Sequence, residues 1–198
     1  RFISSGTTSS HTTGFDHTHY ESTYASGSRT GTIYIDIPSN YYHQFAMAWI
    51  VEDNIYDYLS HMAVIPYVAT PYASLPSSGT ATYTGEASGI YYDTTNNQAR
   101  ELSGTVQIQA NWTNKTIAAA YAPYAPGITF ATLSTPSNLS IDSNSQFYGP
   151  MTGSGWGGVN NIYGTFAGSA YQEVGGVINI QPDYYDDDVG IAQWMAKK

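Results

Sequence analysis

From residue 80 to the C-terminus, polar and apolar residues alternate in a series of short segments. In the clearest of them, three polar residues alternate with three apolar ones, Thr105, Gln107 and Gln109 with Val106, Ile108 and Ala110. This period of two is typical of a β-strand with one wet face and one dry face. This example lies within the predicted strand 101–112, and the other predicted strands cover 80–93, 116–122, 127–134, 138–143, 163–180 (a hairpin of two strands) and 189–196, with Gly, Asn, Asp and Pro turns between them. About eight short antiparallel strands predict an up-and-down β-barrel, which leaves no unpaired sheet edge.

The composition agrees with a mainly β protein and excludes several classes of partner. The 198 residues include 19 Tyr and 19 Gly, which suit aromatic strands and tight turns. A net charge of −9 disfavours nucleic acid and anionic membranes as partners. No apolar run is long enough for a membrane span, so we expect none. The chain has no cysteine, and disulfides and thiolate chemistry are therefore excluded.

The first 78 residues differ in character from the rest. They hold all five histidines of the chain, which are His11, His17, His19, His43 and His61. The stretch 70–81 contains two prolines and small polar residues, which favours a linker. We therefore place a boundary near Ser78, with a small N-terminal domain at 1–78 and the eight-stranded antiparallel barrel at 79–198.

The N-terminal domain has a less regular pattern. In the segment 31–38, isoleucines alternate with polar neighbours and predict a strand. The run 45–51 is apolar on both faces, so we expect it to be covered on both sides. Apolar residues at helical spacing predict a short helix over 53–62, namely Ile55, Tyr58, Leu59 and Met62. Asp53 or Asn54 is available to cap that helix.

One segment of the barrel carries a more specific signal. The stretch 163–180, YGTFAGSAYQEVGGVINI, resembles the signature hairpin of the C-terminal barrel in the transferrin-binding protein B family. The matching residues are Gly164, Phe166, Gly168, Ala170, Glu173, Gly175 and Gly176, while Ile178 stands near the usual place of an aromatic residue. The segment 79–89 resembles the first barrel strand of that family, and 190–198 resembles its C-terminal close, with Trp194 in the aromatic position.

The resemblance covers residues 79–198 and implies that the two parts of the chain have different roles. In this family the barrel is mainly a scaffold, and an N-terminal handle domain, here 1–78, binds the ligand. The family includes binders of transferrin, binders of complement factor H, and small secreted haem binders called hemophilins. A short handle that contains every histidine is most similar to a hemophilin. The resemblance therefore implies a hemophore, secreted from or held at the outer-membrane surface of a Gram-negative bacterium. Its partners would be haem, an outer-membrane haem receptor and a host haem carrier.

Two histidines of the handle lie among aromatic and apolar residues that suit haem. Haem needs an axial ligand, an apolar slot and groups that receive its propionates. Taken with the resemblance, His61 and His43 are the expected iron ligands, and the expected pocket residues are Tyr42, Trp49, Tyr58 and Met62. His61 is preferred because the predicted helix would hold it in a fixed direction. Taken alone, each histidine is more simply explained as a structural residue.

Two other functions stay open at this stage. His17 and His19, with Asp16 or His11, have a spacing that suits bare Zn, Cu or Ni. The many tyrosines suit a surface module that binds a host protein, of the transferrin or complement-regulator type. An enzyme is not expected, because the chain has no G-x-S-x-G elbow and its barrel segment has no histidine to act as a base.

Overall fold

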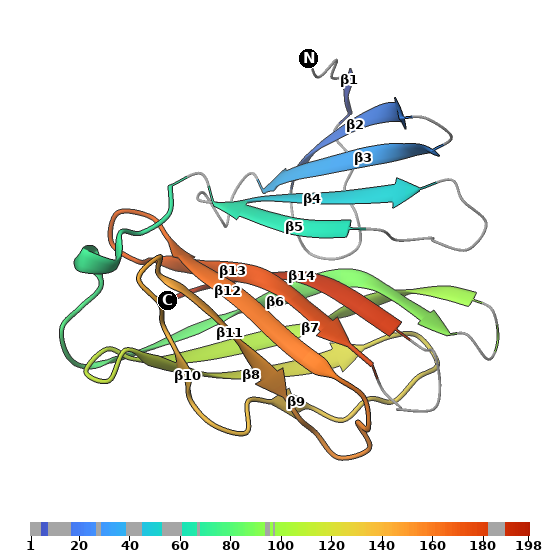
Figure 1. The fold of residues 1–198 in the computed structure, drawn as a ribbon. Helices are drawn as coiled ribbons and strands as arrows, with labels where there is room; N and C mark the ends of the chain where they lie inside the picture. The colour runs from blue at the N-terminus through green and yellow to red at the C-terminus, as the bar shows by residue number, and fades with distance from the viewer. Residues whose placement is uncertain are drawn as a thin grey trace.

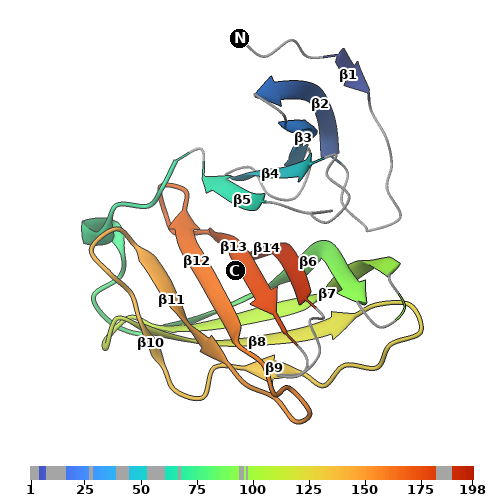
Figure 2. The same ribbon diagram turned by 45° about the vertical axis from the view of Figure 1, so that its right-hand side comes forward.

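The computed structural model describes residues 5–7, 17–26, 29–38, 45–52, 61–66, 68–93, 96, 98–181 and 189–198. Before residue 68, the description covers the strand backbones only. Among the described residues, none of the helices has the length and apolar character needed to cross a bilayer. Figures 1 and 2 show two sheets, a small N-terminal one above a larger, rolled C-terminal one.

The N-terminal sheet is antiparallel, and its strands follow one another in sequence order. They are β1 (Ser5–Thr7), β2 (His17–Ser26), β3 (Arg29–Pro38), β4 (Phe45–Glu52) and β5 (His61–Pro66). The strand predicted at 31–38 is thereby confirmed as β3, and the apolar run 45–51 lies in β4.

The helix predicted over 53–62 is wrong at its C-terminal end. His61 and Met62 begin β5, which pairs with β4, and residues 53–60 lie outside the described residues. The apolar run that follows His61 gains a full ladder of hydrogen bonds against β4, and this tertiary pairing overrides the local helical spacing.

The C-terminal sheet forms the predicted barrel. Its strands are β6 (Thr80–Asp93), β7 (Gln98–Asn111), β8 (Thr116–Tyr124), β9 (Leu133–Ser134), β10 (Leu139–Ser140), β11 (Gln146–Met151), β12 (Asn160–Ala167), β13 (Glu173–Ile180) and β14 (Val189–Lys197). The order is β10-β8-β7-β6-β14-β13-β12-β11, and every pair is antiparallel. β9 also pairs with β8, so β9 and β10 share one position. A bridge between Ser134 and Thr152 joins that position to β11, which gives an eight-stranded, nearly closed barrel.

The predicted and observed barrel strands differ most at three places: the predicted segment 138–143 is a strand only at Leu139–Ser140, the predicted segment 127–134 is likewise short, and β11 was not predicted. Only the last two residues of 127–134 are a strand, because the chain turns tightly between Ala125 and Ile128, with Gly127 at a φ of +79°. β11 was not among the predicted strands, because Gly149 and Pro150 suggest a turn. Pro150 is tolerated there because β11 lies at the barrel seam, where one of its edges is only partly paired.

Side chains fill the barrel interior. Its largest fully buried members are Trp112, Trp194, Tyr83, Tyr121 and Phe166. Phe166 packs edge-to-face against Trp112, with ring centroids 5.2 Å apart, and against Tyr83 at 5.7 Å. An eight-stranded barrel is just narrow enough for side chains to fill it, and that is the case here.

The signature hairpin depends on glycine at two positions. Gly168 has a φ of +88° in the turn between β12 and β13, a conformation that other residues rarely adopt. At Gly176, a Cβ atom would lie 1.8 Å from the carbonyl oxygen of Tyr163, so no side chain fits between the two strands. The segment 163–180 therefore forms the hairpin that the resemblance implies, with a turn at Gly168 and a close approach of the strands at Gly176.

The stretch predicted as a linker packs against the barrel. Thr70 donates from its backbone N–H to the carbonyl of Phe166 (3.0 Å) and from Oγ1 to the carbonyl of Gly168 (2.6 Å). A short 3₁₀ helix, η1 (Tyr72–Ser74), follows, and the side chain of Leu75 is buried in the barrel core. These contacts hold residues 68–76 against the barrel, and the domain boundary near Ser78 stays a prediction.

Candidate functional site

Three of the predicted haem residues lie on neighbouring strands of the N-terminal sheet, where Met62 and Trp49 are directly opposed and His61 is one position along, on the alternate face. His61 is the first residue of β5 and pairs in register with Ile50 of β4, and the next residue, Met62, pairs with Trp49. Directly opposed residues of antiparallel strands have Cα atoms only about 5 Å apart. The other three predicted residues, His43, Tyr42 and Tyr58, lie outside the described residues, so the pocket itself stays a prediction.

The remaining histidines lie elsewhere in the chain. His17 and His19 are on β2, opposite Pro38 and Asp36 of β3. Two whole strands, β3 and β4, separate β2 from β5, so the register does not bring His17 or His19 next to His61. His11 and Asp16 lie outside the described residues. Within the part of the chain that the structure describes, no group of three or more His, Asp or Glu residues could hold a metal ion.

The sheet that carries His61 is seated on one wall of the barrel. β5 lies against β13 and β14 in both views (Figures 1 and 2). On these two strands the residues that alternate with the interior side chains are also buried, among them Glu173, Gln193 and Met195. On β6 and β7 the equivalent residues, such as Thr82 and Gln107, are exposed. Residues 173–176 of β13 and 192–196 of β14 therefore form a covered wall, and β6, β7 and β8 form an open wall.

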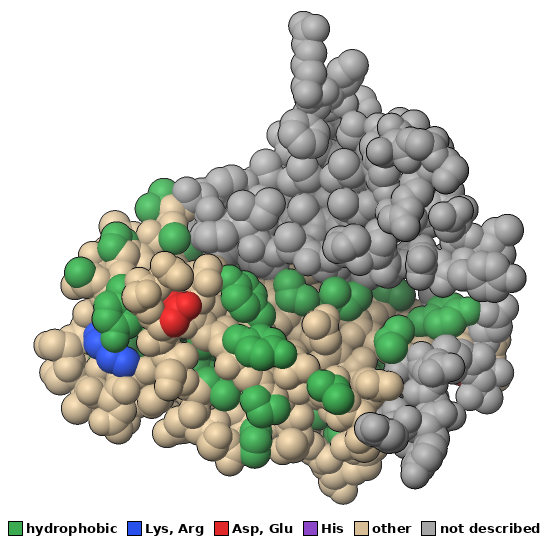
Figure 3. Space-filling view, viewed as in Figure 1, with side chains coloured by type: hydrophobic (Ala, Val, Ile, Leu, Met, Phe, Trp, Pro, Cys, Tyr) green, Lys and Arg blue, Asp and Glu red, His purple; other side chains and the backbone are tan. Residues whose placement is uncertain are grey.

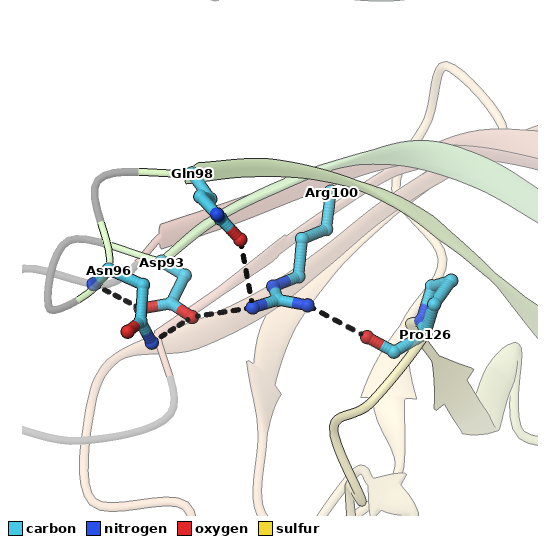
Figure 4. Close-up of polar contacts among 5 residues, drawn as sticks. All are labelled: Asp93, Asn96, Gln98, Arg100 and Pro126. Carbon is cyan, nitrogen blue, oxygen red and sulfur yellow. Dashed lines mark hydrogen bonds and ion pairs between the residues drawn. The ribbon is translucent and has the colours of Figure 1, made fainter.

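A polar network at one end of the open wall is structural. Figure 4 shows Arg100 of β7 with its Nη2 3.3 Å from Oδ2 of Asp93 and 3.2 Å from Oε1 of Gln98, while Nη1 donates to the carbonyl of Pro126 at 3.1 Å. Asn96 donates to Asp93 from its backbone N–H and from its side-chain amide, both at 2.9 Å. These two bonds, followed by the nearby Arg100 charge, lower the pKa of Asp93. With its oxygens bonded in this way, the carboxylate is suited to hold the hairpin and not to move a proton.

The open wall also carries a groove of about 370 Å³ over β6, β7 and β8. Hydroxyl, amide and alanine side chains line it, including Thr82, Gln109, Asn111 and Ala118. The lining has no histidine, no charged group and no aromatic ring. These side chains do not suit haem, which needs an axial ligand and an apolar slot.

A second exposed feature was not identified from the sequence. Tyr148 of β11 pairs in register with Tyr163 of β12, and both side chains reach solvent. The alternation around Tyr163 was visible in the sequence, but its partner strand was not predicted. The Tyr148–Tyr163 pair could have been found only if β11 had been recognised.

Comparison with known proteins bears on the fold. No family model matches the sequence, and no curated protein matches it. Solved structures do match, among them intact Ap-TbpB with its N and C lobes, at a TM-score of 0.61 and 14% identity, over 90% of this chain and 38% of that one. A double mutant of Transferrin Binding Protein B from Haemophilus parasuis Hp5 matches at a TM-score of 0.62 and 16% identity, over 90% and 36%. The isotype 1 protein from serogroup B Neisseria meningitidis matches at 0.58 and 15%, over 93% and 35%.

These matches include more of this chain than the sequence motifs do. The motifs cover 79–198, whereas about nine-tenths of the chain superposes on those proteins, so the N-terminal sheet is included in part. The chain spans little more than one third of each of these three proteins. At 14–16% identity the likeness concerns the fold alone. The small sheet and the barrel together have a fold similar to a lobe of transferrin-binding protein B.

Proposed function

We propose that this chain is a non-enzymatic binding module for iron acquisition, and that haem, held on the N-terminal sheet, is its ligand. The observation that carries the proposal is the contrast between the two sheets. The barrel interior is filled by side chains, and its described surface has no histidine, whereas the N-terminal sheet has His61 on β5 and the directly opposed pair Met62 and Trp49 on β5 and β4. A ligand of this type therefore has its donors in the N-terminal sheet, which the barrel supports at β5.

The roles follow from the chemistry of haem. His61 supplies an axial imidazole, and His43 supplies the opposite ligand or a wall of the pocket. Tyr42, Trp49, Tyr58 and Met62 supply apolar and aromatic contact for the macrocycle. The module acts outside the cell or at the outer-membrane surface of a Gram-negative bacterium. It takes haem from a host carrier and passes it to an outer-membrane receptor.

A hemin titration of the full chain tests this proposal. One equivalent of hemin should give a sharpened Soret band, and His61→Ala should shift the maximum and weaken the affinity. His19→Ala is the matched control, since it removes an imidazole from β2 of the same sheet and should leave the band in place. The absence of a Soret band at one equivalent would contradict the haem proposal.

A second function is favoured by the fold. The matched proteins are named for transferrin binding, and the described surface of this chain exposes tyrosines, which commonly anchor protein contacts. Immobilised chain tested against iron-loaded transferrin separates this function from haem binding. A carrier of bare metal through His11, His17 and His19 would take up zinc in a calorimetric titration, and an alanine replacement of His17 would abolish that signal.

A further inference from the structure

The outer face of β11, β12 and β13 carries a row of apolar side chains. Tyr148 pairs with Tyr163, and Tyr163 pairs with Val177, so the three residues lie side by side across three strands. Tyr148 is 66% exposed and Tyr163 is 37% exposed. We call these three residues the tyrosine row. Figure 3 shows hydrophobic side chains (green) gathered over this part of the barrel, with Lys and Arg (blue) only at its left end in that view.

A carboxylate stands next to this row. Asp142 begins the turn between β10 and β11, where its Oδ1 accepts backbone N–H bonds from Asn144 at 2.8 Å and Gln146 at 2.9 Å. The pKa of the Tyr163 phenol is raised, first by partial burial and second by the negative charge of Asp142. The carboxylate is therefore close enough to interact with the phenol. Among the described residues, Oδ2 of Asp142 accepts no hydrogen bond, and it is available to a ligand.

The four cations of residues 68–198 lie on other strands and turns than the row. Arg100 is in the network at the end of β6 and β7, and Lys115 is in the turn between β7 and β8, over the ring of Tyr72. Lys197 is at the end of β14, and Lys198 lies over the ring of Tyr171. The tyrosine row therefore combines aromatic faces and one carboxylate with no positive charge of its own.

We propose that the tyrosine row and Asp142 form a docking surface for a partner protein that presents arginine or lysine side chains. A guanidinium or ammonium group stacks on a tyrosine ring and is attracted by the negative face of that ring. The same group can form a charge-assisted hydrogen bond with the Asp142 carboxylate. Tyrosine also gives a large contact area for little loss of conformational entropy. The proposal does not depend on haem binding, which involves the other sheet.

Charge argues against the other occupants of this surface. A second copy of the chain would bring another net charge of −9 and another Asp142 to the same contact. An anionic membrane would be repelled for the same reason. A basic partner protein is attracted by the same negative charge that repels a second copy of the chain and an anionic membrane.

The test uses the full chain, labelled with ¹⁵N, and a hexa-arginine peptide as the probe. We expect the largest backbone shift changes at Tyr148, Tyr163, Val177 and Asp142. The double replacement Tyr148→Thr with Tyr163→Thr should weaken binding about tenfold or more, as truncation of interface anchors does. Threonine keeps the preference for a strand, so the barrel should stay folded. Asp142→Asn keeps the oxygen that accepts the turn bonds and should weaken binding about threefold.

Two matched variants control for unspecific effects. Tyr124, on β8, is 60% exposed, and Tyr124→Thr removes an equivalent aromatic group from another site. Glu101→Gln removes one exposed negative charge from β7. Both should leave the affinity within about twofold of the original, as surface changes away from a contact do.

Four results would overturn the proposal. The first is shift changes spread evenly over the acidic surface, and the second is equal weakening by Tyr124→Thr. The third is equal binding of a hexa-glutamate peptide. The fourth is a dimer in sedimentation that the tyrosine double variant abolishes, because that would assign the row to a second copy. The mapping of shifts on the unmodified chain decides the proposal even if a variant fails to fold.

Discussion

The open wall and the covered wall of this barrel both bury the side chains that face the interior, but they differ in the exposure of the side chains that face outward. On the open wall, β7 alternates buried Val106 and Ile108 with exposed Thr105 and Gln107. On the covered wall, β14 is buried without interruption from Ala192 to Ala196. On both walls every second side chain must face the filled interior. The side chains between them face solvent on the open wall, whereas on the covered wall β5 packs over them and excludes the solvent. A continuous buried run in one half of a barrel thus marks the place where another part of the molecule is seated.

The largest effect should come from breaking the covered wall at its closest approach. Gly176→Val places a side chain where Cβ already overlaps the backbone of Tyr163, and backbone atoms cannot move aside without separating β12 from β13. We expect a loss of more than about 3 kcal/mol in the free energy of unfolding, or failure to fold. Urea denaturation measures it, with Gln107→Val on the open wall as the control. An unchanged midpoint for Gly176→Val would contradict the observed close approach.

A milder replacement tests whether the covered wall is covered in solution. Met195 faces outward on β14 and is fully buried, so Met195→Ala should cost about 2–4 kcal/mol, as for a core methionine. Gln109→Ala, also outward-facing but on the open wall, should change stability by less than about 0.5 kcal/mol. Thermal and urea unfolding of both variants give the comparison. Equal, small effects would mean that the N-terminal sheet does not rest on the barrel.

The segment before the barrel should contribute a smaller amount. A fragment of residues 68–198 keeps Thr70 and Leu75 on the barrel, whereas a fragment of residues 79–198 lacks both. Both fragments lack the N-terminal sheet and expose the same wall, so the difference between their free energies of unfolding measures the contribution of residues 68–78. We expect the longer fragment to be about 2 kcal/mol more stable, mainly because Leu75 is buried. Equal stabilities by urea unfolding would support a barrel domain that begins at 79, as the sequence predicts.

The smallest effect should be seen at low pH, at the end of the open wall. The pKa of Asp93 is lowered in the folded chain, chiefly by its bonds from Asn96, so the folded state binds the proton more weakly than the unfolded state. The stabilisation is therefore present above the ordinary pKa of about 3.9 and is lost as the pH falls through the lower folded value. Asp93→Asn should be less stable than the original at pH 6 and should approach it at pH 3. A difference that stays constant between these pH values would contradict this linkage.

The sequence predicted the first and the last strand of the barrel well. The predicted 80–93 coincides with β6, and the predicted 189–196 differs from β14 by a single residue. The signature hairpin was predicted from its glycine pattern, and the structure shows why the pattern is informative: Gly168 and Gly176 lie where a turn and a close approach require glycine. β11 was missed because Gly149 and Pro150 resemble turn residues, and only the barrel seam makes a proline acceptable there.

The N-terminal part and the candidate sites were harder to predict. Helical spacing around Tyr58 and Met62 could not reveal that Met62 pairs with Trp49, because that contact is set by the fold of the sheet and not by neighbours in sequence. The covered wall was equally hidden, since nothing in the residues of β14 says which element lies on it. The Tyr148–Tyr163 pair joins a predicted strand to a missed one. The identity of the ligand stays a prediction, because three of the six expected haem residues lie outside the described residues.

The packing of β5 on β13 and β14 has a consequence for the order in which the molecule folds. The N-terminal sheet is synthesised first, yet the wall on which it rests is built from β13 and β14, near the other end of the sequence. β14 also pairs with β6, so the first and last strands of the barrel in the sequence are neighbours in the sheet. Contacts between such distant segments form late, because a long loop must close before they gain any stabilisation. The arrival of one strand thus completes the barrel and gives the N-terminal sheet its support in the same step.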